Sequence, residues 1–137
     1  MHSFLTYPLL VSLTLFAAPA FAERIMTADE FAQMVTGKTL YFNRFGEAFG
    51  AEQYFDDKRV IWAFENGQCQ RGIWFENAAG EICFIYDNDP GSQCWNFLEG
   101  DGGEYRARLS GADPSQDLVT RKIGTDALDC PLPDLGV

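Results

Sequence analysis

The sequence predicts a mainly β protein in which a short N-terminal helix precedes an antiparallel meander of about seven strands, closed or nearly closed as a small barrel. Short β-type runs recur after residue 39, separated by clusters of turn residues. Within several runs every second position carries a large apolar side chain, which indicates a sheet with one buried face. An isolated meander would expose two edges, so closure into a barrel is favoured.

The helix is expected to begin after Thr27. Thr27 and Glu30, three residues later, match a capping box that satisfies the first backbone N–H groups of a helix. Phe31, Met34 and Val35 then follow at the spacing of one apolar helix face. These signals predict a short amphipathic helix that packs against the sheet.

The predicted strands follow the helix directly. Their residue ranges are 39–42, 50–55, 59–64, 72–75, 82–86, 93–98 and 104–109. The chain contains 12 Phe, 5 Tyr and 3 Trp, enough aromatic side chains to fill the core of a small domain. We therefore expect Trp62, Trp74 and Trp95 to lie in the core or at a barrel end before we assign them to ligand stacking.

The first 22 residues have the features of a signal peptide. Residues 9–18 are apolar, and Ala-Phe-Ala at 20–22 has the small side chains that signal peptidase accepts. Cleavage there would leave 23–137 as one domain in the periplasm or secreted. A retained membrane anchor is the alternative, but the apolar run is shorter than a bilayer requires. We expect no stable membrane insertion after cleavage.

The mature chain is strongly acidic. Twenty acidic residues against ten basic ones give a net charge of −10, which disfavours binding to nucleic acid or to anionic lipid surfaces.

After Gly111 the β pattern weakens, and prolines at 131 and 133 interrupt regular structure. Residues 111–137 are therefore expected to be loosely structured, and the protein is expected to be a monomer.

Four cysteines indicate two disulfides in an exported chain. Three pairings are possible. A hairpin around a loop at 87–92 would place Cys83 opposite Cys94, which leaves Cys69 to pair with Cys130. The second bridge would close a loop of about sixty residues and tie the C-terminal segment to the domain. Zinc binding is disfavoured because the chain has no Cys-x-x-Cys sequence.

The sequence lacks most of the residue combinations that catalysis requires. Because His2 is the only histidine, the mature chain has no Ser-His or Cys-His pair, and we predict no catalytic residue, cofactor or metal site. A carboxylate pair stays open, although most candidates are expected at strand ends or turns. The candidates are Glu52, Asp56, Asp57, Glu65, Glu76 and Glu81. Arg44 and Arg71 could hold an anionic ligand or, more commonly, a surface carboxylate.

One succession of motifs carries a family resemblance that spans residues 27–97. It consists of Cys69-x-x-Gly72-x-Trp74, then Ile82-Cys83-Phe84-x-Tyr86, then Cys94-Trp95. It resembles a group of small exported proteobacterial proteins, most of them uncharacterised. The resemblance implies a signal peptide, a barrel-like sheet and a disulfide, with no reaction attached. The architecture is more weakly similar to bacterial lipocalin-like inhibitors of secreted metalloproteases, which implies a small lipocalin-like barrel.

Two classes of function follow from these patterns. The first is a non-enzymatic, envelope-associated binding protein that holds a small apolar ligand or a protein partner at the mouth of the barrel. Contacts would then come from Trp62, Trp74, Trp95, Tyr86 and Arg71. The alternatives are a lipocalin-like inhibitor of a secreted protease and a carboxylate-dependent enzyme. Whether the barrel has an open cavity decides between a filled core and a binding site.

Overall fold

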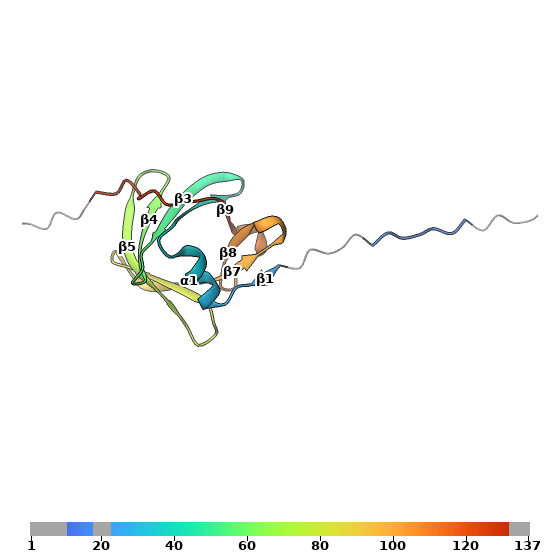
Figure 1. Ribbon diagram of the computed structural model, residues 1–137, viewed down its shortest axis with the longest axis horizontal. Helices are drawn as coiled ribbons and strands as arrows, with labels where there is room; N and C mark the ends of the chain where they lie inside the picture. Colours follow the sequence, from blue (N-terminus) through green and yellow to red (C-terminus); the bar gives the residue numbers. More distant parts are fainter. Residues whose placement is uncertain (1–10, 18–22, 132–137) are drawn as a thin grey trace, which may run out of the picture.

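The computed structural model describes residues 11–17 and 23–131 (Figure 1). Residues 11–17 are exposed and belong to no helix or strand. The predicted cleavage site at 20–22 and the last residues, 132–137, lie outside the described residues. Within the described ranges, the first helix or strand begins at Arg24.

The described residues contain one α-helix, two short 3-10 turns and nine strands. The helical elements are α1 (Ala28–Val35), η1 (Asp101–Gly103) and η2 (Pro114–Gln116). The strands are β1 (Arg24–Ile25), β2 (Thr39–Arg44), β3 (Glu47–Tyr54), β4 (Arg59–Phe64), β5 (Cys69–Glu76), β6 (Ile82–Tyr86), β7 (Asp89–Glu99), β8 (Tyr105–Leu109) and β9 (Leu118–Gly124).

Strands β2 to β9 form a closed antiparallel barrel of eight strands. Each strand pairs with the next one in sequence, and β9 returns to pair with β2. The predicted meander and its closure are therefore confirmed, and all seven predicted strands are present. The strand β1 adds a two-residue pairing along the end of β7.

The strand that closes the barrel lies in a segment predicted to be loosely structured. Residues 118–124 form β9, so that prediction is wrong for this stretch. Leu118 is buried, but the following residues are half-buried or exposed and give little apolar alternation. The strand is held by backbone pairing to β2 on one side and to β8 on the other, which its own sequence does not reveal.

The helix α1 covers one end of the barrel (Figure 1). The predicted capping box is present: Thr27 Oγ1 accepts from the Glu30 N–H at 3.2 Å, and the Thr27 N–H donates to Glu30 Oε2 at 2.8 Å. Phe31 is fully buried, and its ring lies 5.6 Å from Tyr54, 5.1 Å from Trp74 and 4.3 Å from Phe97. Phe31 therefore joins three strands and closes this end.

Both predicted disulfides are present. Cys83 and Cys94 are direct partners on β6 and β7, with Cα atoms 3.9 Å apart. Cys69 and Cys130 have Cα atoms 6.0 Å apart and fix the segment after β9 against β5. The loop between the first pair is shorter than the predicted 87–92, because β7 already begins at Asp89.

Removing the Phe31 ring is expected to destabilise the fold strongly. Phe31→Ala would leave a cavity among three aromatic rings, and such truncations cost about 3–5 kcal/mol. Gln33→Ala, on the exposed face of the same helix, is the matched control and should change stability by less than about 0.5 kcal/mol. Urea unfolding of both variants measures the difference, and equal stabilities would contradict the role given to Phe31.

Candidate functional site: an aromatic cavity with a buried carboxyl group

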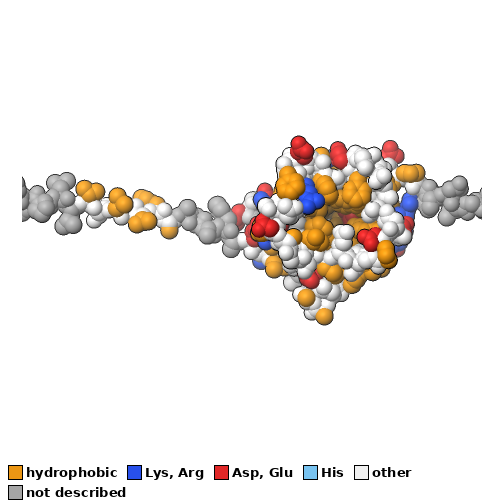
Figure 2. All heavy atoms as spheres, turned by 180° about the vertical axis from the view of Figure 1, so that it is seen from behind, with side chains coloured by type: hydrophobic (Ala, Val, Ile, Leu, Met, Phe, Trp, Pro, Cys, Tyr) orange, Lys and Arg blue, Asp and Glu red, His pale blue; other side chains and the backbone are white. Residues whose placement is uncertain are grey.

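The end of the barrel opposite α1 opens into an internal cavity of about 470 Å³. Three hairpin turns and the segment between β8 and β9 lie around its mouth. Figure 2 shows hydrophobic side chains gathered around this hollow, with a basic side chain at the rim. The residues that line it are Phe42, Arg44, Phe49, Glu52, Tyr54, Trp62, Phe64, Gln70, Phe84, Tyr86, Asp89, Gln93, Trp95, Phe97, Ala107, Leu109, Ala112, Gln116 and Leu118.

Aromatic rings form most of the wall. On β4 the alternation of side chains brings Trp62 and Phe64 to the inner face, with ring centroids 5.7 Å apart and nearly perpendicular planes. Phe49 on β3 lies 5.9 Å from Trp62 and 6.2 Å from Phe64. Phe42 on β2 lies 6.1 Å from Trp62. The rings from three adjacent strands therefore make one continuous apolar surface.

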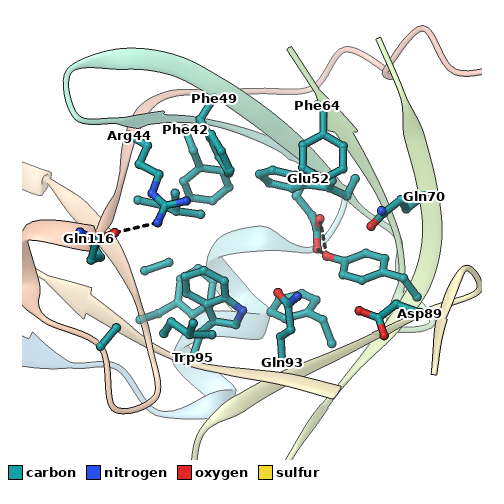
Figure 3. A pocket seen from close by; sticks show the side chains of 18 of the residues that line it. Phe42, Arg44, Phe49, Glu52, Phe64, Gln70, Asp89, Gln93, Trp95 and Gln116 are labelled. Carbon is teal, nitrogen blue, oxygen red and sulfur yellow. Dashed lines mark hydrogen bonds between the residues drawn. The ribbon is translucent and has the colours of Figure 1, made fainter. Parts of the chain in front are cut away.

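Glu52 places a carboxyl group in this apolar wall. It lies within β3, two residues before the inward-facing Tyr54 and directly opposite Trp62 of β4. Only 2% of the residue is exposed. The Tyr86 hydroxyl donates to the carboxyl group, with O–O distances of 3.0 and 2.9 Å (Figure 3). Among the described residues no other group donates to it, so most of its acceptor capacity is unused.

Tyr86 reaches Glu52 across two strands, β4 and β5, because β5 carries a glycine. Gly72 on β5 pairs with Tyr86 on β6, and a Cβ atom added at Gly72 would lie 2.8 Å from Tyr86 Cδ1. The Tyr86 ring therefore occupies the space of the missing side chain. From there its hydroxyl extends toward β3 to meet the carboxyl group.

Burial controls the ionisation of this pair. Loss of hydration raises the pKa of Glu52 from 4.5 to about 8, and the hydrogen bond from Tyr86 opposes this only partly. Burial, followed by the proximity of Glu52, raises the pKa of Tyr86 far above its ordinary value. In the empty cavity at pH 7, Glu52 is thus mainly a neutral acid and Tyr86 a neutral phenol.

The mouth carries a second polar group, Arg44, on the strand next to that of Glu52. Arg44 Nη2 donates to Gln116 Oε1 at 2.8 Å, and the Arg44 guanidinium carbon lies 5.4 Å from the centre of the Phe49 ring. Arg44 Nε is buried and has no hydrogen-bond partner among the described residues. Arg44 and Glu52 come from the adjacent strands β2 and β3, and Figure 3 shows Phe42 and Phe49 between their side chains.

The structure divides the five predicted contact residues into two groups. Trp62, Trp95 and Tyr86 line the cavity. Trp74 instead packs at the closed end, against Phe31 and beneath the Lys58 ammonium, whose nitrogen lies 4.8 Å from the ring centre. Arg71 does not line the cavity either, because its guanidinium donates to the Pro131 carbonyl at 3.1 Å. The tryptophans are thus partly core and partly cavity wall.

Glu52 provides the buried carboxyl group of the cavity, but the sequence predicts it only as one of six candidate carboxylates. Of those six, Glu52 alone lines the cavity, so the structure brings no pair of them together there. Asp57 pairs with Arg59, and Glu81 accepts from Asn77. One signal in the sequence could have singled out Glu52: its even spacing from Tyr54 puts it on the buried face of β3. The polar mouth residues Gln70, Gln93 and Gln116 had no such signal.

Comparisons with known proteins add no family. No family model, no curated protein and no solved structure matches the chain. Within residues 11–17 and 23–131, no group of three or more His, Cys, Asp or Glu side chains is placed to hold a metal ion. No helix in these same ranges is both long and apolar enough to span a membrane. Fold and site define the class: a small antiparallel barrel with one end closed and an aromatic cavity open at the other.

The raised pKa of Glu52 should make the fold less stable as pH increases. The unfolded chain releases the proton of Glu52 near pH 4.5 and the folded chain near pH 8, so the folded state binds more protons between these values. Between pH 5 and pH 8.5 the wild type should therefore lose about 4 kcal/mol relative to Glu52→Gln. Urea unfolding at both pH values measures this loss, and parallel pH profiles for the two proteins would contradict it.

Proposed function

We propose that the protein is a non-enzymatic, exported binding protein that holds a small, mainly apolar ligand inside its barrel. The observation that carries the proposal is the open cavity of about 470 Å³. Ligand sites of small molecules typically measure about 300–1,000 Å³ and combine apolar walls with a few polar groups. The aromatic wall around Glu52 and Tyr86 has this composition.

A small ligand is favoured over a protein partner by the orientation of the aromatic side chains. A partner that docked on the mouth would need apolar area at the surface, but Trp62 is only 8% exposed and Trp95 is half-buried. Their rings face the interior, where a ligand would contact them. The three glutamines at the mouth, Gln70, Gln93 and Gln116, would orient a polar end of the ligand.

Export is the second part of the proposal. Disulfides persist mainly in oxidising compartments, and this domain has two, with no free cysteine among the described residues. Together with the signal-peptide features of residues 1–22, they support residence in the periplasm or secretion.

A neutral fluorescent dye tests the cavity as the binding site. N-phenyl-1-naphthylamine should bind the wild type with one dye per chain and gain fluorescence in the apolar interior. Ala112→Trp fills the cavity at the mouth and should weaken binding at least about tenfold. Ala78→Trp is the matched control, because Ala78 is exposed in the turn between β5 and β6, at the closed end. Equal binding by both variants, or no binding of this dye or of any other small apolar probe by the wild type, would contradict the proposal.

A further inference from the structure

We infer that the ligand is a monovalent organic cation, such as a primary amine with an apolar body, whose ammonium group binds the carboxylate of Glu52. The inference rests on the proposed function, because it assigns the chemistry of the ligand to the same cavity. The carboxyl group of Glu52 is buried, and its one hydrogen-bond donor among the described residues is the Tyr86 hydroxyl.

The unused acceptor capacity of Glu52 is the first argument. A carboxylate offers about four acceptor positions, and the Tyr86 hydroxyl supplies a single hydrogen. Burying such a group without partners is costly, so a fold optimised only for stability would have an apolar side chain at this position. A ligand that brings an N–H donor and a positive charge would satisfy the group completely.

The aromatic wall is the second argument. The faces of Phe and Trp rings carry partial negative charge and attract cations. Trp62 lies directly opposite Glu52 on the neighbouring strand, and Phe42, Phe64 and Phe84 line the same cavity. The ring faces around Glu52 would thus attract the ammonium group of a ligand. They would repel a ligand that carries a carboxylate or sulfate group. The net charge of −10 also favours the approach of cations.

Among the other charged groups of the cavity, Arg44 disfavours a second positive charge on the ligand. Besides Glu52, the titratable or charged residues among the lining side chains are Tyr54, Tyr86, Asp89 and Arg44. The two tyrosines are neutral hydroxyl groups, and Asp89 is exposed at the mouth. Arg44 lies at the mouth, apart from Glu52 (Figure 3), so it would repel a second ammonium group at the mouth end of the ligand.

Cation binding should be coupled to release of a proton. In the empty cavity the pKa of Glu52 is raised to about 8, whereas simple amines keep their proton up to about pH 10. Between pH 6 and pH 8 the amine therefore binds only as Glu52 ionises, and its affinity should rise about fiftyfold, nearly tenfold of it in the first pH unit. Above pH 8 the affinity should level off.

Calorimetric titration of the full, disulfide-bonded chain with matched probes tests the inference. The pairs are hexylamine with 1-hexanol, phenethylamine with 2-phenylethanol, and tryptamine with tryptophol. At pH 8 each amine should bind the wild type about tenfold to a hundredfold more tightly than its alcohol. Glu52→Gln should abolish this preference while it still binds the alcohols. Glu65→Gln, which removes an exposed carboxylate from the turn between β4 and β5 at the mouth, should keep it.

The outcomes separate the two proposals. If the alcohols bind as tightly as the amines, if Glu52→Gln keeps the preference, or if amine affinity is flat from pH 6 to pH 8, the cation inference is overturned and the cavity remains a binding site. If N-phenyl-1-naphthylamine occupies the cavity but no amine displaces it, the same conclusion holds. If neither the dye nor any amine or alcohol binds, the proposed function fails together with the inference.

Discussion

The pairing of β9 with β2 is the constraint on which the rest of the structure depends. It gives every barrel strand two hydrogen-bonded neighbours and turns a meander into an enclosed space. Eight strands leave an interior that side chains can fill or that can hold one small ligand. Here Phe31 fills the end beneath α1, and the interior beyond that layer is open to the mouth. The barrel contains a deep cavity because its α1 end is closed and its other end is open.

Glu52 shows what the enclosed space imposes on a polar residue. On an open sheet its carboxyl group would be hydrated and ionised at neutral pH, but inside the barrel it keeps its proton up to about pH 8. The group weakens the fold over the pH range in which it would otherwise ionise. Tyr86 holds the carboxyl group in place through a gap left by Gly72, so its orientation is fixed before any ligand arrives. Burial of Glu52 lowers the stability of the fold, but it leaves a carboxyl group already oriented to bind a ligand.

The sequence predicts the local features of this protein well and the long-range ones poorly. The capping box, the seven central strands and the cross-strand disulfide depend on neighbouring residues or on one hairpin, and all are present. The closing strand β9 depends on pairing with β2, some eighty positions earlier in the chain, and its own polar composition hides it. Trp62 and Trp74 look equivalent in sequence, yet one lines the cavity and the other packs on Phe31, because the position along the barrel axis decides.

The ionisation of Glu52 is the property that most directly tests this account. A carbon-13 NMR titration of the glutamate side-chain carboxyl signals, with Glu52 assigned by its loss in Glu52→Gln, would measure it in the empty protein. A titration midpoint near pH 8 is the predicted result, and addition of hexylamine at pH 7 should move the signal to its ionised position. A midpoint near 4.5 would show that the carboxyl group is hydrated, and would contradict an enclosed cavity built around it.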